Sequence, residues 1–271
     1  MRHTTLAVVL LVVTAGCQVG LPGAAAGPGT ETPTYSPAPV PTLSSTPSTL
    51  APGITAGGVV DHGALGQAHR SVLAANRYGR LVTLEVRPAR GPPVYRYQRL
   101  RRAGPDGVLT VAEVRRDWDR DGTETVARTV WWAPESGPII ARSETEDGRI
   151  VTRRVTVVPP PRHRARGPAR LLDLATRNVT AGPRPGTVEL SGTTSVAPGV
   201  ADDWRPNQAV SVRATVSRRG LMRELRVAYS SRVDGSPGSV AYIDRYFLVD
   251  PDPGEAPTAP TWYPSARNAT S

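Results

Sequence analysis

The sequence predicts an α+β fold: a curved antiparallel β-sheet, or incomplete β-barrel, of about ten strands with two helices packed on its concave face. From about residue 78 onward, apolar and polar residues alternate with period two, which is typical of strands that bury one face. Two short segments instead have apolar residues at helical spacing. Because the strand segments follow one another through short turns, we expect neighbours in the chain to pair as hairpins.

The first helix is expected to begin after Asp61 and to extend to about Asn76. Asp61 is a suitable N-cap, since its carboxylate can accept a hydrogen bond from a free N–H of the first turn. Leu65, Ala68 and Val72 recur on one face of this segment. That face should pack against the sheet.

Strands account for most of the remaining chain. Six are expected around residues 82–86, 95–98, 108–114, 126–132, 139–144 and 150–158. Three prolines at residues 159–161 then interrupt the pattern, and a second helix is expected from Pro168 to Thr176. Four more strands are expected around residues 187–195, 210–216, 225–229 and 243–249, so the folded domain covers residues 55–250. Residues 251–271 are Pro-rich and are expected to be irregular.

The N-terminus has the features of an export signal. A short basic start is followed by the apolar run LAVVLLVV and then by Thr14-Ala15-Gly16-Cys17. The run is far shorter than the roughly 20 residues that a membrane-spanning helix needs. Cys17 is the only cysteine, and its position after Ala-Gly resembles a lipobox, so we expect residues 1–16 to be removed and Cys17 to be lipidated. The alternative is ordinary signal cleavage beside an incidental cysteine.

A lipidated Cys17 would place the protein on the outer face of the cytoplasmic membrane, anchored by lipid. Residues 17–54 are rich in Pro, Thr and Ser and have no apolar period, so they are expected to form a disordered tether. The membrane is therefore the partner that the sequence predicts directly.

The charge of the chain limits which classes of binding partner are expected besides the membrane. The formal net charge is +10, and all 33 basic residues are arginines. They are scattered along the strands, often beside Asp or Glu, which argues against nucleic acid as a partner. The densest basic run, residues 162–166, could meet anionic headgroups, where each arginine contributes about 1 kcal/mol. The alternative is a solvated loop.

Catalysis and cofactors find little support in the sequence. There is no Gly-x-Ser-x-Gly turn, and the histidines lack partners at metal-ligand spacing, so we expect no catalytic residue, no cofactor and no enzyme activity. Asp117, Asp119 and Asp121 resemble the opening of a calcium loop. Arg128 stands where such a loop needs a Glu, so a polar hairpin loop is the preferred interpretation.

Large aromatic side chains are the candidates for a ligand cavity: Trp131, Trp132, Trp204 and Phe247. The adjacent Trp131 and Trp132 should point to opposite faces of their strand. With one Phe and two Met in the chain, few bulky residues are available to fill the core, which weakly favours a cavity. Ordinary core packing is the alternative. Asn178 and Asn268 begin N-x-Thr sequons and are candidate glycosylation sites.

Several of these features together resemble a known group. A lipobox, a Thr/Pro tether, the opening helix ALGQAHRSVLAAN, the strand pair VSVRATVSRRGLMRELRVAYSSRVDG and the closing Pro260-Thr261-Trp262-Tyr263 are similar to haloarchaeal surface lipoproteins of unassigned function. That group's architecture looks like the LolA/LppX-type lipoprotein carriers, whose half-barrel accepts acyl chains. The resemblance implies a non-enzymatic lipoprotein that binds a lipid or another apolar ligand. An envelope module with a closed core is the alternative, and an exported hydrolase a distant one.

Overall fold

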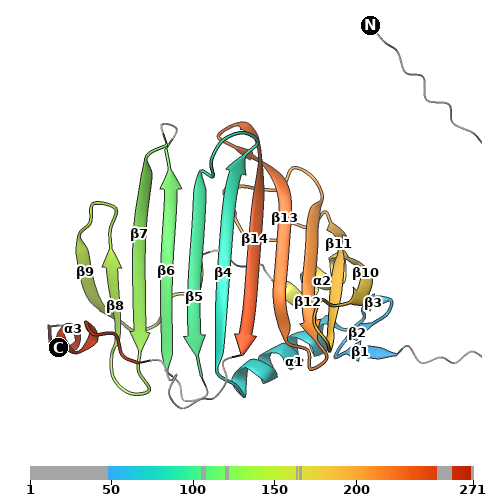
Figure 1. The fold of residues 1–271 in the computed structure, drawn as a ribbon, viewed down its shortest axis with the longest axis horizontal. Helices are drawn as coiled ribbons and strands as arrows, with labels where there is room; N and C mark the ends of the chain where they lie inside the picture. Colours follow the sequence, from blue (N-terminus) through green and yellow to red (C-terminus); the bar gives the residue numbers. More distant parts are fainter. Residues whose placement is uncertain are drawn as a thin grey trace, which may run out of the picture. The chain divides into compact units, whose positions relative to one another are not determined.

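One antiparallel sheet of eleven strands dominates the part of the chain that the structure describes, which is residues 48–104, 108–119, 122–162, 164, 167–248 and 258–269 of a computed structural model. The strands are β4 (Tyr78–Pro88), β5 (Tyr95–Ala103), β6 (Leu109–Trp118), β7 (Glu124–Ala133), β8 (Ile139–Glu144), β9 (Ile150–Val155), β10 (Thr176–Ala181), β11 (Thr187–Thr194), β12 (Val210–Ser217), β13 (Met222–Val233) and β14 (Ser236–Leu248). Their order in space is β10-β11-β12-β13-β14-β4-β5-β6-β7-β8-β9 (Figure 1).

The strand order contains one long connection. From β4 the chain adds strands one at a time as far as β9 at one edge of the sheet. It then continues to β10 at the opposite edge and returns hairpin by hairpin until β14 pairs with β4, with Tyr242 opposite Leu84. Residues 156–175 make this crossing, so the segment that follows β9 must pass over one face of the sheet.

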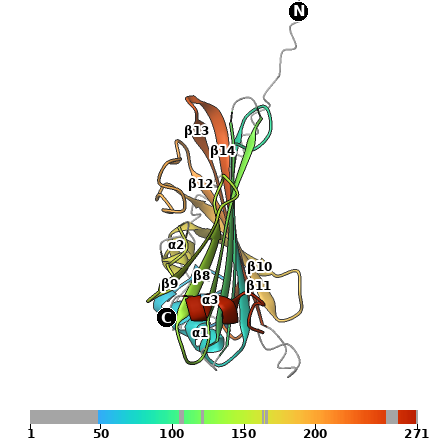
Figure 2. The same cartoon turned by 90° about the vertical axis from the view of Figure 1, so that its left-hand side faces the viewer.

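Two helices lie on that face. Helix α1 (His62–Ala74) begins at Asp61, whose carboxylate accepts the N–H of Ala64 at 2.9 Å. Helix α2 (Pro168–Ala175) begins with a proline, which suits a first helical position because its missing N–H would have no partner there. A small sheet of β1 (Thr49–Ala51), β2 (Ile54–Thr55) and β3 (Gly58–Val59) precedes α1. Figure 2 shows the twisted sheet along its edge, with α2 beside it.

The core is unevenly distributed along the sheet. The main cluster lies under α1 and α2, where Leu65 and Leu172 meet inward side chains of β4, β5 and β11–β14, such as Leu84 and Leu225. The other half of the sheet has two small clusters on opposite faces, one around Trp131 and one around Trp132. Helix α3 (Tyr263–Ala269) packs against β8 and β9 in the second of these, through Tyr263.

The structure confirms a mostly antiparallel sheet with the two expected helices, and it corrects the expected boundaries. Residues 49–54 belong to the fold although they were assigned to the tether, because Ala51 and Ile54 are buried in the main cluster. Strand β10 forms directly after α2, and the C-terminal segment contains α3 where irregular chain was expected. Edge strands β9 and β10 do not pair with each other within the described ranges, so the sheet does not close. Residues 1–16, Cys17 and the tether as far as residue 47 lie outside the described residues.

Candidate functional site: an arginine-lined groove

Two neighbouring pockets lie on the helix-bearing face. The first, here called the strap pocket, lies between the sheet and residues 156–161, here called the strap, and has a volume of about 460 Å³. The second, the helix pocket, lies beside α1 and α2 and has a volume of about 660 Å³. Both are lined by Arg80 and Arg164, so the two pockets adjoin and form one groove. Volumes of this size are typical of small-molecule sites.

The register of the sheet explains why arginines line an otherwise apolar floor. Tyr246, Arg80, Arg101 and Val111 are successive cross-strand partners on β14, β4, β5 and β6. Directly paired residues point to the same face. This row therefore places two arginines side by side on the helix-bearing face, next to the aliphatic side chains of β6.

Arg80 is held by a buried carboxylate. Its Nε and Nη2 donate to the two oxygens of Asp244 at 2.9 and 2.7 Å, and Asp244 is 1% exposed. The hydroxyl of Tyr242 donates to the same carboxylate at 3.2 Å. Burial alone would lower the pKa of Arg80, but the hydrogen bonds and charge of Asp244 raise that pKa above its ordinary value. Arg80 is therefore a fixed, neutralised part of the groove wall.

Arg99 fixes the strap. Its Nη1 donates to Glu113 at 3.0 Å, and its Nη2 donates to the carbonyl oxygen of Pro159 in the strap. The hydroxyl of Tyr97 donates to the same Glu113 at 2.9 Å. Arg99 is 5% exposed, and its guanidinium lies 5.3 Å from the ring centroid of Trp131. This buried arginine joins the sheet to the chain that covers it.

Four further arginines of the groove have no acidic partner. Arg101 and Arg164 line the strap pocket, and Arg70, Arg164 and Arg170 line the helix pocket. None of the four forms an ion pair with another residue in the described part of the chain, and no Asp or Glu lines either pocket. The groove therefore combines an apolar floor with an excess of positive charge.

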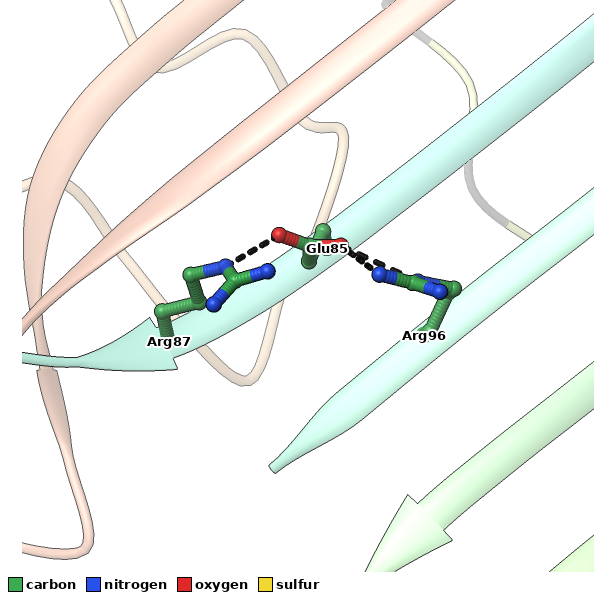
Figure 3. Close-up of polar contacts among 3 residues, drawn as sticks. All are labelled: Glu85, Arg87 and Arg96. Atoms are coloured by element: carbon green, nitrogen blue, oxygen red, sulfur yellow. Dashed lines mark hydrogen bonds and ion pairs between the residues drawn. The ribbon is translucent and has the colours of Figure 1, made fainter. Parts of the chain in front are cut away.

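The opposite face of the sheet differs in this respect. Glu85 accepts hydrogen bonds from Arg87 and Arg96, the latter through Nε at 3.0 Å (Figure 3). Burial would raise the pKa of Glu85, but the hydrogen bonds from Arg87 and Arg96 lower that pKa overall. Glu224 is held in the same way by Arg226 and Arg245. At these two places, each carboxylate is shared by two arginines and offsets part of their charge.

His69 is a half-buried titratable group of the helix pocket. Its Nδ1 accepts the backbone N–H of Met222 at 3.2 Å, and its ring meets that of Tyr246 edge-on at 4.6 Å between centroids. Burial lowers the pKa of His69 to about 4; Asp244 opposes this shift, while Arg80 and Arg70 add to it. The imidazole is therefore neutral near pH 7.

The four aromatic residues predicted to line a cavity do not come together. Trp131 packs with Val111 under the strap side of the sheet, whereas Trp132 lies on the opposite face against Tyr263. Trp204 packs on Tyr95, with 5.1 Å between ring centroids. Phe247 is 41% exposed. Its ring covers Gly79, where an added Cβ would fall 2.1 Å from a ring atom. Of the four, Trp131 is the one closest in structure to the groove, through Val111 and Arg99.

The remaining candidates lie in three places. Asp117, on β6, is 2.9 Å from Arg115 in an ion pair, Asp119 follows in the hairpin turn, and Asp121 lies outside the described residues. No group of three metal-binding side chains occurs within the described ranges. Asn178 is exposed on edge strand β10 and Asn268 is exposed on α3.

Sequence reasoning found only part of the groove. Arg164 belongs to the basic run that the sequence singled out, but Arg80 and Arg101 were passed over as ordinary strand arginines. Their strand phase is a usable signal. Arg80 precedes Val82, Leu84 and Val86 by even steps, which places it on the apolar face of its strand. A charge in that phase is unusual and marks a site.

Comparison with protein families and with curated proteins finds no match to this chain. Among the helices that the structure describes, none is both long and apolar enough to cross a bilayer.

Proposed function

We propose that this protein is an exported lipoprotein, anchored through Cys17 to the outer face of the cytoplasmic membrane, that binds a lipid or another apolar ligand without catalysing a reaction. One observation supports ligand binding most directly: the strap pocket has a volume of about 460 Å³ above a partly apolar floor. Leu109, Val111 and Ile139 from three strands face Val158 of the covering chain there. Apolar surface held apart in this way favours an apolar guest.

The likeness to LolA/LppX-type carriers belongs to the same proposal. An open antiparallel sheet with helices on one face agrees with it, as does a groove on the helix-bearing side. The side chains of the groove support binding rather than catalysis. Its polar side chains are arginines, two histidines, Thr156 and Tyr246, and within the described residues no Ser, Cys or carboxylate lines it. Acyl transfer and glycoside hydrolysis need such groups.

Native mass spectrometry of protein extracted from membranes tests the ligand. A co-purifying lipid, together with uptake of the neutral apolar probe N-phenyl-1-naphthylamine, is the expected result. Ile139→Trp should fill the strap pocket and abolish uptake, while Ile150→Trp on the exposed side of β9 should leave uptake unchanged. An apo mass and no uptake by the unmodified protein would contradict ligand binding and favour an envelope module with a closed core.

Cell fractionation tests the anchor separately. Cys17→Ser removes the thiol to which lipid would be attached, so the domain should move from the membrane fraction to the medium. Cleavage that still occurs while the protein remains with the membrane would overturn the lipid anchor. The result is independent of the ligand experiment.

A further inference from the structure

We infer that the ligand is an anionic amphiphile, whose negatively charged head lies where the two pockets meet and whose apolar part fills the strap pocket. The inference rests on the proposed function and adds the chemical class of the ligand. It follows from one juxtaposition: arginines that form no ion pair among the described residues lie beside an aliphatic floor, in a groove that no Asp or Glu of the described residues lines.

The position of the head follows from the residues that the pockets share. Arg80 and Arg164 line both pockets, and Arg101 is the cross-strand neighbour of Arg80. Asp244 already neutralises Arg80. The uncompensated charge at this point is therefore that of Arg101 and Arg164. A phosphate or carboxylate there would accept charge-assisted hydrogen bonds from both.

The position of the tail follows from the polarity of the walls. Beyond Arg101 the strap pocket is lined by Leu109, Val111 and Ile139, with Val158 above them. The helix pocket has fewer aliphatic side chains and two more unpaired arginines, Arg70 and Arg170. The groove thus offers aliphatic side chains in the strap pocket beside the arginines at its junction with the helix pocket, which matches a molecule with one apolar and one charged end.

Solvation strengthens this charge pattern. On the opposite face, Glu85 and Glu224 each pair with two arginines and offset part of their positive charge. In the groove, the buried pair Arg80–Asp244 and the apolar floor reduce the local dielectric. An anion bound beside them is screened less than one on an open surface. The positive charge alone would bind free phosphate. The adjoining aliphatic floor can in addition bury an alkyl chain, which favours a ligand that has both parts.

The test compares three ligands by calorimetry: dodecyl phosphate below its micelle concentration, dodecanol, and inorganic phosphate. We expect dodecyl phosphate to bind at least tenfold more tightly than dodecanol, and inorganic phosphate to bind weakly. The affinity for dodecyl phosphate should fall as NaCl rises from 20 to about 500 mM, since salt screens the charge of the head.

Equal affinity for dodecanol and dodecyl phosphate would overturn the inference and leave the proposed function standing. If inorganic phosphate binds tightly, and dodecyl phosphate binds no more tightly, the groove is a site for free anions. That result would also overturn the inference. If neither dodecanol nor the neutral probe binds, the proposed function itself fails.

Adjacent arginines supply matched variants. Arg101→Gln should lower the affinity for dodecyl phosphate about tenfold, the loss expected for one charge-assisted hydrogen bond, and should leave dodecanol unaffected. Arg102→Gln removes the same charge one residue away, but Arg102 points to the opposite face, so no change is expected. Arg164→Gln should behave as Arg101→Gln does. All three side chains are exposed and none forms an ion pair among the described residues, so the variants should fold, which circular dichroism checks. Equal losses in Arg101→Gln and Arg102→Gln would show a general charge effect and contradict the site.

Discussion

The two faces of the sheet use the same residue type for different purposes. On the open face, Glu85 lies between Arg87 and Arg96 (Figure 3), and Glu224 pairs with two arginines in the same way, so each carboxylate offsets part of the charge beside it. On the helix-bearing face, Arg80 has one buried carboxylate and its neighbour Arg101 has no acidic partner in the described part of the chain. The two faces therefore differ in which acidic side chains lie beside their arginines.

The largest difference between the faces should appear when a buried carboxylate is removed. Asp244→Ala leaves Arg80 without its partner beneath α1, and we expect a loss of about 3–5 kcal/mol in the free energy of unfolding. Urea denaturation at pH 7 measures it. The matched change on the open face is Glu85→Ala, expected to cost about 1 kcal/mol or less. Similar losses in the two variants would remove the distinction between the faces.

Core substitutions test the same difference through packing. Leu84 is fully buried in the main cluster, so Leu84→Ala should lower the free energy of unfolding by about 2–5 kcal/mol. Leu100 is half-buried on the open face, and Leu100→Ala should cost about 1 kcal/mol. Chemical denaturation of both variants gives the comparison. A costlier Leu100→Ala would mean that a partner covers the open face.

Mild acid should weaken the helix-bearing face first. The pKa of His69 is lowered to about 4 in the folded protein, while an unfolded histidine has a pKa near 6.5. Between these two pH values, His69 binds a proton in the unfolded chain but not in the folded protein. The free energy of unfolding therefore falls as the pH drops from 6.5 toward 4. Between pH 7.0 and 5.5 we expect a loss of about 1 kcal/mol in the free energy of unfolding.

Two histidine variants isolate this effect. His69→Asn should remove the loss between pH 7.0 and 5.5, because no titrating group remains at that position. His62→Asn changes a histidine that is 51% exposed and should retain the loss. Asp244, Arg80 and Arg70 are the charged groups that act on His69. A pH response that survives in His69→Asn would assign it to another group.

The smallest effect should come from titrating the open face. The pKa of Glu85 lies below its ordinary value, so its ion pairs stabilise the fold above the unfolded pKa near 4.5 and are lost as the pH falls through the folded pKa. Glu85→Gln should therefore lower the free energy of unfolding at pH 7 by about 1 kcal/mol or less, and this difference should shrink at low pH, where Glu85 itself is protonated. Thermal unfolding of the variant and of the unmodified protein at pH 7 and pH 3.5 measures both differences in stability. A large loss at pH 7 would indicate a structural role for this cluster.

Local signals in the sequence predicted the elements well. Asp61 and the spacing from Leu65 predicted the first helix, and period-two alternation predicted the strands that became β4–β9 and β11–β14. Strand β10 was missed because Thr176–Ala181 has one inward apolar residue, Val179, at the edge of the main cluster. Helix α3 was missed because Pro264 masks a short helical turn that tertiary contacts with Ile140 and Trp132 stabilise.

The groove was harder to predict than the fold. Arg80 and its partner Asp244 are 164 residues apart, and no local pattern joins β4 to β14. The choice of Trp131, Trp132, Trp204 and Phe247 relied on residue size, which does not specify a face or a neighbour. Arg101 and Arg102 are chemically identical in the sequence. Only the register of β5 against β4 separates a groove residue from a surface one.

The crossing from β9 to β10 has a consequence for the order of folding. The centre of the sheet joins β4, near the start of the domain, to β14, near its end, and such distant pairings form slowly. The strap pocket is lined by β4–β8 and the chain up to Arg164, whereas the helix pocket also needs Met222 and Tyr246 from the last two strands. In a chain that leaves a membrane channel N-terminus first, the strap pocket, which takes the apolar tail, would form first. The helix pocket, which completes the site of the charged head, would form later. The selectivity of the groove would then be acquired in the final step of folding.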